Sequence, residues 1–344
     1  MNIFDIVTAG NLKAIYESQE NRASTVLEAF FPIRRVRGLK FSFVKGLRNK
    51  PVALVSANYD TNVLYRDKIG VEKLSGNLPY FKEADKIDEE LRQTLNSTKE
   101  EFLDVDIERI LDNFNNLIES ADVTAERLRA QLISTGTITI SENGVDKQYD
   151  YGFSTSKQYK ELETKWSAST ADPLADIDKA LADYYALTGE EARYMIMDVT
   201  LLRKIRNNEK VLSWFAGLST PNLYPTNELA KQYLESQFNV TIVLMDKSYL
   251  AARDFNGTPV KYYPEDRFTL TSTIDLGETL CGTTPEEADL LSGSSSAESA
   301  VVTDKGVAIT TWKLVDPVNV NVKVSESCIA SCPNIDKLYI VKVL

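Results

Sequence analysis

The chain has 344 residues, of which 43% are hydrophobic and 26% charged, a composition typical of a globular protein that buries a sizeable core. Fifty acidic residues against 39 basic ones give a net charge of −11, the opposite of the basic excess expected of a nucleic-acid-binding protein. Histidine is absent, which excludes the commonest metal ligand and every serine–histidine or cysteine–histidine catalytic pair.

Neither a membrane-spanning segment nor a secretion signal is expected. No apolar run approaches the roughly 20 residues that cross a bilayer, and the start MNIFDIVTAG lacks the basic residues and apolar stretch of a signal peptide. The cysteines are Cys281, Cys328 and Cys332, an odd number that fits a reducing compartment. The stretch CIASC lacks a second pair of ligands, so buried, inert thiols are favoured over a metal or redox role.

The N-terminal stretch begins with a short predicted helix over residues 5–19, followed by an irregular arm. Residues 34–50 then carry seven basic residues and no acidic one, and LKFSFVKG within them alternates like a strand. Residues 52–82 have extended character, with Gly70, Gly76 and Pro79 as breaks. Because this segment has few apolar residues for its length, we expect it to project from the body rather than to build a core.

The strongest periodic signal follows this segment. Ser97 and Glu100 match a capping box. Apolar residues then recur at steps of three or four from Leu103 to Leu132, which predicts a long helix. About 30 residues at 1.5 Å per residue would give a length of roughly 45–50 Å. The stretch Asp122-Val-Thr is a place where this helix could divide in two.

A hairpin and then an α/β region complete the chain. Asn143-Gly144 is a strong hairpin turn, and Asp172-Pro173 predicts the start of a helix that Gly189 ends. RYMIMD and NVTIVLMD are predicted to be buried strands, with the helical stretches TLLRKIRNNEKVLSWFAG and TNELAKQYLESQF between them. After further strands and a flexible loop at residues 292–299, VNVNVKV and LYIVKVL return the chain to β-structure.

Motifs that carry chemistry are scarce. Glycine-rich phosphate loops, HExxH, EF-hand loops and GxSxG are absent. The sharpest enzymatic candidates are Asp198 and Asp246, each an acid that ends an apolar strand, where α/β enzymes often place functional groups. Two carboxylates brought together could hold Mg²⁺ or divide acid and base roles. The favoured interpretation is structural, because the position of Asp198 before a helical run suits a helix cap.

Charge is distributed unevenly along the chain. Residues 34–50 carry only basic charges, whereas residues 83–122 carry 13 acidic residues and four basic ones. A basic arm and an acidic helix could attract each other, either within one chain or between copies in a head-to-tail contact. Two separately solvated surfaces are an equally good interpretation.

The order of these elements resembles the phage-capsid fold of tailed bacteriophages (the Hong Kong 97 type), and more narrowly the lambda-type major capsid protein E family. Five stretches carry the resemblance: NLPYFKEADKID, AQLISTGTITISENGVDKQYDYGF, FNVTIVLMDKSYLAARDFNGTPVKYYPEDRFTLTS, LGETLCGTTPEEADLL and SCPNIDKLYIVKV. Each motif is degenerate alone, and their order supplies the specificity. The correspondence in the order of elements extends over nearly the whole chain from about residue 30 onward.

The resemblance implies an α+β fold in five segments. These are an N-terminal arm (1–39), an extended loop (40–84), a peripheral domain with a spine helix and hairpin (85–171), an axial α/β domain (172–302) and returning strands of the peripheral domain (303–344). The extended loop would lie over a neighbouring subunit.

The function that the resemblance implies is that of a shell subunit rather than an enzyme, with no cofactor and no metal. We expect the major capsid protein of a tailed bacteriophage, located in the virion and assembled in the bacterial host cytoplasm. Its expected partners are copies of itself in hexamers and pentamers, a separate scaffolding protein and a portal protein. A decoration protein is a further candidate, packaged DNA would be contacted only non-specifically, and no membrane is expected.

The candidate contact residues between subunits are charged positions of the arm, the loop and the long helix. They are Arg34, Arg35, Arg37, Lys40, Lys45, Arg48, Arg66, Lys68, Glu100, Asp104 and Glu108. Two alternatives stay open: a metal-dependent α/β enzyme that uses Asp198 and Asp246, and a cellular nanocompartment shell of the same fold.

Overall fold

The computed structural model describes residues 7–18, 25–46, 71–91, 93, 100–168, 170–218, 225–250, 257–293 and 299–344. The chain forms two compact units, each assembled from separate stretches of sequence. The first unit consists of Met1–Ser42, Ser75–Arg129 and Glu278–Ser331, and the second of Phe43–Leu74, Ala130–Gly277 and Cys332–Leu344. Among the helices described, none has the length and apolar character that crossing a membrane requires.

The first unit is built on a four-stranded antiparallel sheet with the strand order β14-β15-β16-β4. The strands are β14 (Ser299–Val302), β15 (Ala308–Val315), β16 (Val318–Glu326) and β4 (Phe81–Ile87). The alternation of VNVNVKV, as predicted, gives β16 an apolar face formed by Val320, Val322 and Val324, all of which are buried.

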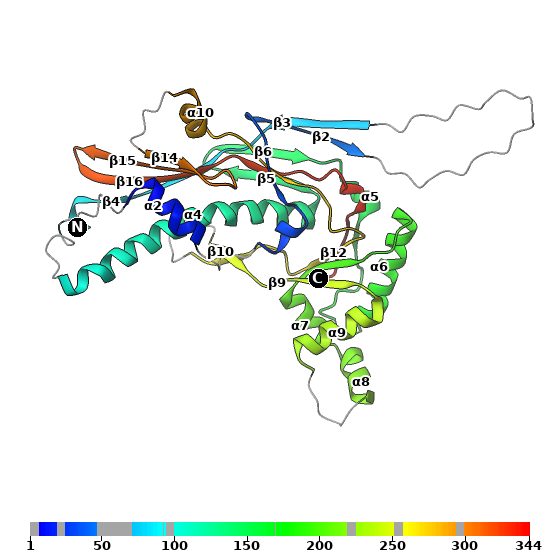
Figure 1. Cartoon of the computed structure of the whole chain (residues 1–344). Coiled ribbons are helices and arrows are strands. Elements are labelled where there is room, and N and C mark those ends of the chain that lie inside the picture. The colour runs from blue at the N-terminus through cyan, green and yellow to red at the C-terminus, as the bar shows by residue number, and fades with distance from the viewer. Residues whose placement is uncertain are drawn as a thin grey trace, which may run out of the picture. The chain divides into compact units, whose positions relative to one another are not determined.

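Two helices cover the apolar face of this sheet (Figure 1). Leu12 of α2 (Ala9–Ser18) and Phe114 of α4 (Glu100–Thr135) share one core with the valines of β16. α4 is a single helix of 36 residues, so the predicted long helix is confirmed and the suggested break near Asp122 is wrong. The helix continues through Arg129, where the first unit ends, into the second unit.

The polar face of the sheet carries α10 (Pro285–Ser292). Glu286, in the first turn of this helix, accepts hydrogen bonds from Lys323 Nζ (2.6 Å) and Ser325 Oγ (2.9 Å) of β16. A second sheet of the same unit has the order β1-β13-β17. β1 (Ile33–Arg35) runs parallel to β13 (Thr279–Cys281), and β17 (Cys328–Ala330) runs antiparallel to β13.

The strands that flank the expected extended loop are β2 (Lys40–Gly46) and β3 (Val71–Asn77), which pair with each other. Residues 47–70 of the expected extended loop lie outside the described residues. Leu78, directly after β3, is only 5% exposed, and its N–H donates to the Leu39 carbonyl (2.8 Å). A Cβ on Gly282 would lie 2.3 Å from the Leu78 side chain. The expectation that all of residues 52–82 project is therefore wrong for Leu78, which packs in the space left by a glycine.

The second unit is built on a five-stranded mixed sheet with the order β7-β18-β12-β8-β9. The strands are β7 (Tyr159–Glu161), β18 (Tyr339–Lys342), β12 (Arg267–Thr271), β8 (Tyr194–Asp198) and β9 (Thr241–Met245). The two predicted buried strands, β8 and β9, are parallel neighbours. The closing strand β18 lies between β12 and β7, antiparallel to the first and parallel to the second.

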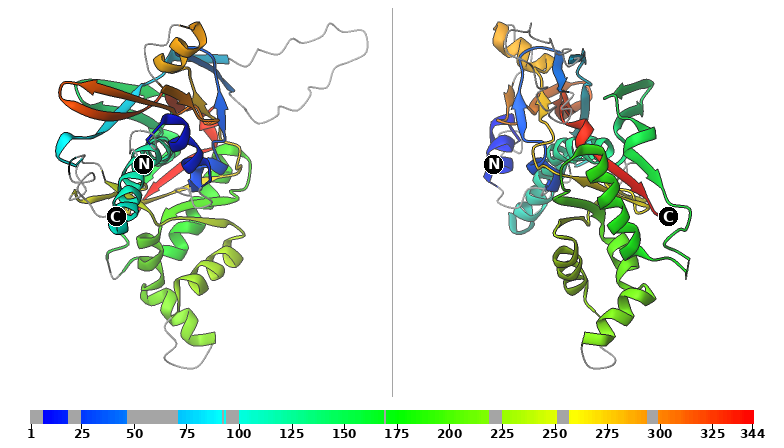
Figure 2. Two further views of the ribbon diagram at one scale, coloured as in Figure 1. Left: turned by 60° about the vertical axis from the view of Figure 1, so that its left-hand side comes forward. Right: turned by 90° about the vertical axis from the view of Figure 1, so that its right-hand side faces the viewer.

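Four helices accompany this sheet: α6 (Pro173–Thr188), α7 (Val199–Arg206), α8 (Glu209–Leu218) and α9 (Asn227–Phe238). Their apolar residues form one core with alternate residues of β8, β12 and β18, and the green helices lie together at the lower end of both views in Figure 2. Asp172 caps α6 and Gly189 ends it with φ 75°, as predicted. The stretch predicted as one helical run is two helices, because Asn207 ends α7.

The opposite face of the sheet receives the last turn of α4. Thr269 Oγ1 donates to the Ile133 carbonyl (3.0 Å), and Arg267 donates to the Ser134 carbonyl (3.1 Å). Gly136 then breaks the helix, and the hairpin of β5 (Thr137–Glu142) and β6 (Val145–Asp150) follows. Its Asn143-Gly144 turn has positive φ at both residues, which confirms the predicted turn. The remaining short elements are η1 (Val26–Ala29), α5 (Thr155–Gln158), β10 (Ser248–Leu250), β11 (Pro259–Lys261) and η2 (Ile335–Lys337).

Candidate functional site

The two acids of the enzymatic hypothesis end neighbouring strands but differ in surroundings. Asp198 is 1% exposed; it accepts hydrogen bonds from the Thr200 N–H (2.6 Å) and Lys261 Nζ (2.7 Å). Asp246, after β9, is exposed. The predicted helix-capping role of Asp198 is confirmed. Both donors reach Oδ1, and an ammonium group beside the carboxylate is a poor arrangement for binding Mg²⁺.

Among the described residues, no group of three or more acids or cysteines is arranged to hold a metal ion. The three cysteines are buried and form no disulfide, as predicted. Burial raises the pKa of Cys281 to about 12 and that of Cys328 well above its ordinary value. Since the thiolate is the reactive form, these thiols are inert at neutral pH.

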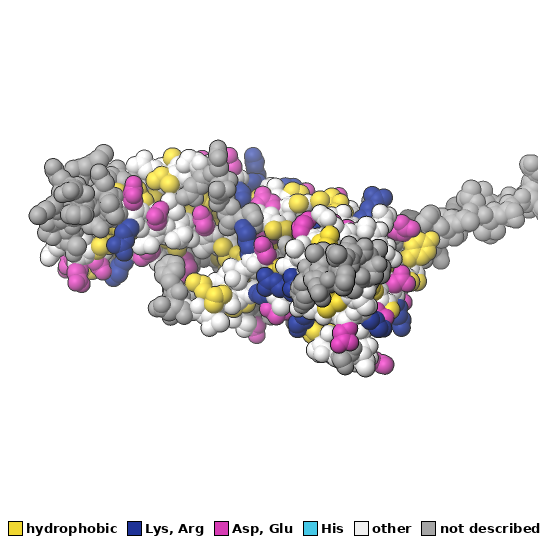
Figure 3. All heavy atoms as spheres, turned by 90° about the horizontal axis from the view of Figure 1, so that it is seen from below, with side chains coloured by type: hydrophobic (Ala, Val, Ile, Leu, Met, Phe, Trp, Pro, Cys, Tyr) yellow, Lys and Arg dark blue, Asp and Glu magenta, His cyan; other side chains and the backbone are white. Residues whose placement is uncertain are grey.

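The candidate contact residues fall into three groups. Arg34 and Arg35 form ion pairs within their own unit, with Glu278 (2.9 Å) and with Glu287 (2.6 Å), rather than with the acidic helix. Arg37, Lys40 and Glu108 are exposed. The side chains of Lys45, Arg48, Arg66, Lys68, Glu100 and Asp104 lie outside the described residues. On the face shown in Figure 3, acidic and basic side chains are interspersed.

A cluster of buried charged groups lies on α4. Asp122, Glu126 and Arg129 follow one another at steps of four and three residues, and so share one side of the helix. They are only 4%, 3% and 1% exposed. Charged residues are rarely this buried unless they are paired, and each of the three has partners from distant parts of the sequence. We call this set and its partners the α4 cluster.

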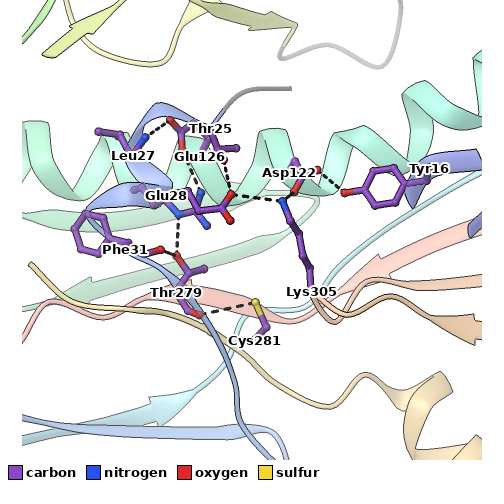
Figure 4. Close-up of polar contacts among 11 residues, drawn as sticks. Tyr16, Thr25, Leu27, Glu28, Phe31, Asp122, Glu126, Thr279, Cys281 and Lys305 are labelled. Atoms are coloured by element: carbon purple, nitrogen blue, oxygen red, sulfur yellow. Dashed lines mark hydrogen bonds and ion pairs between the residues drawn. The ribbon is translucent and has the colours of Figure 1, made fainter. Parts of the chain in front are cut away.

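The α4 cluster fastens the N-terminal segment to the helix (Figure 4). The Tyr16 hydroxyl of α2 donates a short hydrogen bond to Asp122. Glu126 Oε1 accepts from the backbone N–H of Leu27 in η1 (2.9 Å). Lys305, in the turn before β15, bridges Asp122 (2.9 Å) and Glu28 (3.4 Å).

Arg129 connects the cluster to the small sheet. Its Nη1 donates to Glu126 Oε2 (3.2 Å), and its Nε donates to Thr279 Oγ1 of β13 (2.8 Å). The Thr279 hydroxyl in turn donates to the Phe31 carbonyl (2.9 Å). Residues 25–31 are therefore held at both ends by groups that α4 and β13 position (Figure 4). This arrangement determines the course of the N-terminal segment over the first unit.

Burial and neighbouring charges move the pKa values of the cluster in opposite directions. Burial raises the pKa of Glu126, against the Leu27 N–H and the Arg129 guanidinium. Burial also acts on Glu28, but the Thr25 hydroxyl and the Lys305 charge outweigh it and lower the pKa. Glu326, at the end of β16, has its pKa raised to about 8, chiefly by burial. Burial thus favours the protonated form of Glu126 and Glu326, whereas the neighbours of Glu28 favour its ionised form.

Sequence reasoning missed the α4 cluster. The periodicity of α4 drew attention to its apolar residues, and Asp122 was considered only as a break. The available signal was the spacing of Asp122, Glu126 and Arg129, beside the predicted apolar stripe of Ala121, Ala125 and Leu128. Their partners could not be read from the sequence, because Lys305 is 183 residues from Asp122.

The two units together have the phage-capsid fold of the Hong Kong 97 type. The chain is similar in structure to a putative prophage capsid protein from Escherichia coli CFT073, at a TM-score of 0.62 and 17% identity, over 98% of this chain and 99% of that one. It is also similar to a phage-related protein from Bordetella bronchiseptica RB50 (TM-score 0.57, 12% identity, 98% and 97% covered). A third is the cyanophage A-1(L) capsid (0.53, 10%, 95% and 94%). No protein-family model and no curated protein matches the chain.

Proposed function

We propose that the chain is the major capsid protein of a tailed bacteriophage, which assembles into the icosahedral shell around packaged double-stranded DNA. The observation that carries the proposal is the similarity to a prophage capsid protein over nearly the full length of both chains. A fold can host several functions, but here nearly the whole chain is used by the shared fold.

The lambda-type capsid protein E family is the narrower proposal. Its support is the order of the sequence stretches, from NLPYFKEADKID through the Asn143-Gly144 hairpin to SCPNIDKLYIVKV. The expected location is the virion capsid, after assembly in the host cytoplasm. The proposed partners are other copies of the chain, a separate scaffolding protein and a portal protein, with a decoration protein as a further candidate.

Assembly would rest on heterologous contacts, in which one surface docks onto a different surface of the next copy. A fixed rotation between successive copies closes such contacts into rings. Further contacts between rings would then build the shell. Many modest contacts per subunit hold the particle together by combined valency. In this scheme the exposed charges of Arg37, Lys40 and Glu108 orient neighbouring subunits, and the burial of apolar surface supplies most of the stabilisation.

The test is to express the chain alone and with a candidate scaffolding protein from the same phage genome. Light scattering and negative-stain electron microscopy of the purified material then show whether closed particles form. Closed, regular shells support the proposal, and a protein that stays monomeric under both conditions contradicts it. Particles that instead purify with a co-expressed cellular enzyme inside them would identify a nanocompartment shell, the alternative with the same fold.

A further inference from the structure

Glu326 occupies a position where the sheet would ordinarily place an apolar residue. The side chains of Val320, Val322 and Val324 point from β16 into the core beneath α4, and strand alternation places Glu326 next in the same row. Its side chain is 7% exposed. A carboxyl group there is costly to ionise unless a cation and hydrogen-bond donors meet it.

The hydrogen bonds around Glu326 are incomplete. Its Oε1 is buried without a hydrogen-bond partner among the described residues, and so is Nη2 of Arg129. The donor that does reach this carboxyl group is the Cys328 thiol. A buried carboxylate needs strong hydrogen-bond donors, whereas a protonated carboxyl group needs fewer. The weak Cys328 donor and the unused N–H of Arg129 therefore fit a protonated Glu326 better than an ionised one.

The carboxyl groups in and near the α4 cluster outnumber the cations that contact them, so one carboxyl group can hold a proton. The α4 cluster contains three carboxyl groups, Asp122, Glu126 and Glu28, and two cations that contact them, Lys305 and Arg129. Glu326 is a fourth carboxyl group, which interacts electrostatically with Asp122 and Arg129. Three of the acids have direct partners. Lys305 contacts both Asp122 and Glu28, and Arg129 contacts Glu126. Glu326 is the acid whose neighbours leave it least compensated, and the rise of its pKa to about 8 agrees with that geometry.

We propose that Glu326 is the proton-binding group of a latch that holds residues 25–31 of the N-terminal segment against α4. While Glu326 is protonated, the charge of Arg129 compensates Glu126 alone, and Glu126 accepts a hydrogen bond from the Leu27 N–H. When Glu326 ionises, a second buried carboxylate interacts electrostatically with Arg129, whose Nη2 has no hydrogen-bond partner among the described residues. One guanidinium group must then compensate two acids, and the hold of Glu126 on Leu27 weakens.

The other titratable and charged groups near Glu326 modify this balance. They come from α4, β17 and β13, and are Asp122, Arg127, Arg129, Cys328 and Cys281. Asp122 favours the protonated form of Glu326, whereas Arg127 and Arg129 favour the ionised form. Both thiols stay protonated near neutral pH, because burial raises their pKa values. Glu326, with a pKa of about 8, changes charge between pH 6 and 9.

The direction of the effect follows from linkage. The folded-state pKa of Glu326 lies above the ordinary value of 4.5, so its contribution to stability is fully present below pH 4.5 and is lost as pH rises to about 8. The equilibrium for opening of the latch can rise by at most about tenfold per pH unit in this interval and levels off above it. In the proposal, part of this loss of stability falls on the latch, so residues 25–31 are held most tightly in mild acid and most loosely in mild base.

Hydrogen exchange of the full-length protein, read by mass spectrometry, tests the latch directly. The Leu27 N–H, the donor to Glu126, is the reporter, and peptides from β8 in the second unit serve as an internal reference. After correction for the intrinsic rate, we expect exchange in residues 25–31 to increase at least tenfold from pH 6 to pH 8, with β8 unchanged. No such increase in the wild-type protein overturns the proposal without any variant.

Glu326→Gln supplies the second arm, because the amide mimics the protonated acid in shape and charge. We expect this variant to protect residues 25–31 at pH 8 as well as the wild type does at pH 6. The matched control is Glu278→Gln, which removes the exposed partner of Arg34 and should keep the wild-type pH dependence. A Glu326→Gln protein, folded by circular dichroism, that still loosens between pH 6 and 8 would show that another group carries the proton.

Discussion

At the scale of single residues, the first unit depends on charges that are taken out of water. Arg129 is 1% exposed and contacts Glu126, Thr279 and, through Thr279, the Phe31 carbonyl. Buried ion pairs add little stability compared with well-packed apolar residues, but removing one partner leaves an uncompensated buried charge. The α4 cluster therefore makes the position of the N-terminal segment specific rather than simply stable.

Arg129→Leu removes the cation and keeps much of the side-chain volume. Because the Glu126 carboxylate stays buried without its partner, we expect the free energy of unfolding to fall by about 3–5 kcal/mol. Urea denaturation followed by circular dichroism measures this. Arg109→Leu, on the exposed side of α4, is the control and should change the midpoint little. A fall of less than about 1 kcal/mol for Arg129→Leu would show that the pair contributes little to stability.

Glu286 has the opposite titration behaviour to Glu326. Burial opposes its ionisation, but Lys323, the start of α10, Tyr80 and Ser325 outweigh burial and lower its pKa to about 2. A depressed carboxyl pKa gives stability that is present above pH 4.5 and is lost as pH falls towards 2.

We therefore expect Glu286→Gln to be less stable than the wild type at pH 7, with the difference shrinking as pH falls from 4.5 to 3. Urea midpoints at pH 7, 4.5 and 3 give the comparison. Glu108→Gln, at an exposed position of α4, should follow the wild-type curve throughout. Parallel curves for the wild type and Glu286→Gln would contradict the assignment.

At the scale of secondary-structure elements, the junction between α4 and its hairpin is the most constrained point. Gly136 has φ +76°, and a Cβ at this position would lie 2.2 Å from Cγ of Phe153. Two requirements thus coincide at one residue: a left-handed backbone and the absence of a side chain. Gly144 in the hairpin turn shares only the first, with φ +77° and nothing within 4 Å of its Cβ position.

This pair of glycines separates backbone strain from steric clash. Gly144→Ala forces an alanine into the left-handed conformation without a steric clash, and should lower the free energy of unfolding by about 1 kcal/mol. Gly136→Ala adds the clash with Phe153, so we expect a loss of at least twice that amount and a clearly lower melting temperature. Differential scanning calorimetry of both variants measures the difference. Equal losses would mean that Phe153 moves aside freely.

Elements set by local signals were predictable from the sequence, and elements set by distant partners were not. The helix from Asp172 to Gly189 and the Asn143-Gly144 turn are specified by neighbouring residues, and both are confirmed. The continuity of α4 through Asp122 was not predicted, because Tyr16 and Lys305 satisfy that carboxylate from elsewhere in the chain. Likewise, the ion pairs of Arg34 and Arg35 with Glu278 and Glu287 could not be inferred from charge runs alone.

At the scale of the whole molecule, the proposed function requires surfaces that remain available after folding. Arg34 and Arg35 are engaged within the first unit, so reversing their charges would disturb the fold as well as any assembly. Arg37 and Lys40 are exposed, and no ion pair within the part of the chain that the structure describes involves them. These two positions are the better probes of contacts between subunits.

The double substitution Arg37→Glu and Lys40→Glu should leave the circular dichroism spectrum unchanged and reduce the yield of closed particles at least tenfold. The reason is that like charges would then meet at a contact that the basic side chains favour. Counting particles by electron microscopy at low and high salt measures the effect, which salt should reduce by screening. Lys179→Glu, at an exposed position of α6, is the control, and normal shells from the double variant would contradict the assigned contact.

The three cysteines of this chain also have a practical consequence. All are buried and none forms a disulfide, and burial raises the pKa of Cys281 to about 12, so maleimide reagents should leave the native protein unlabelled. A cysteine introduced at an exposed position, such as Val315 at the tip of the β15–β16 hairpin (89% exposed), would then be the site of rapid conjugation. Dyes, peptides or gold particles could be attached there without first removing the native thiols.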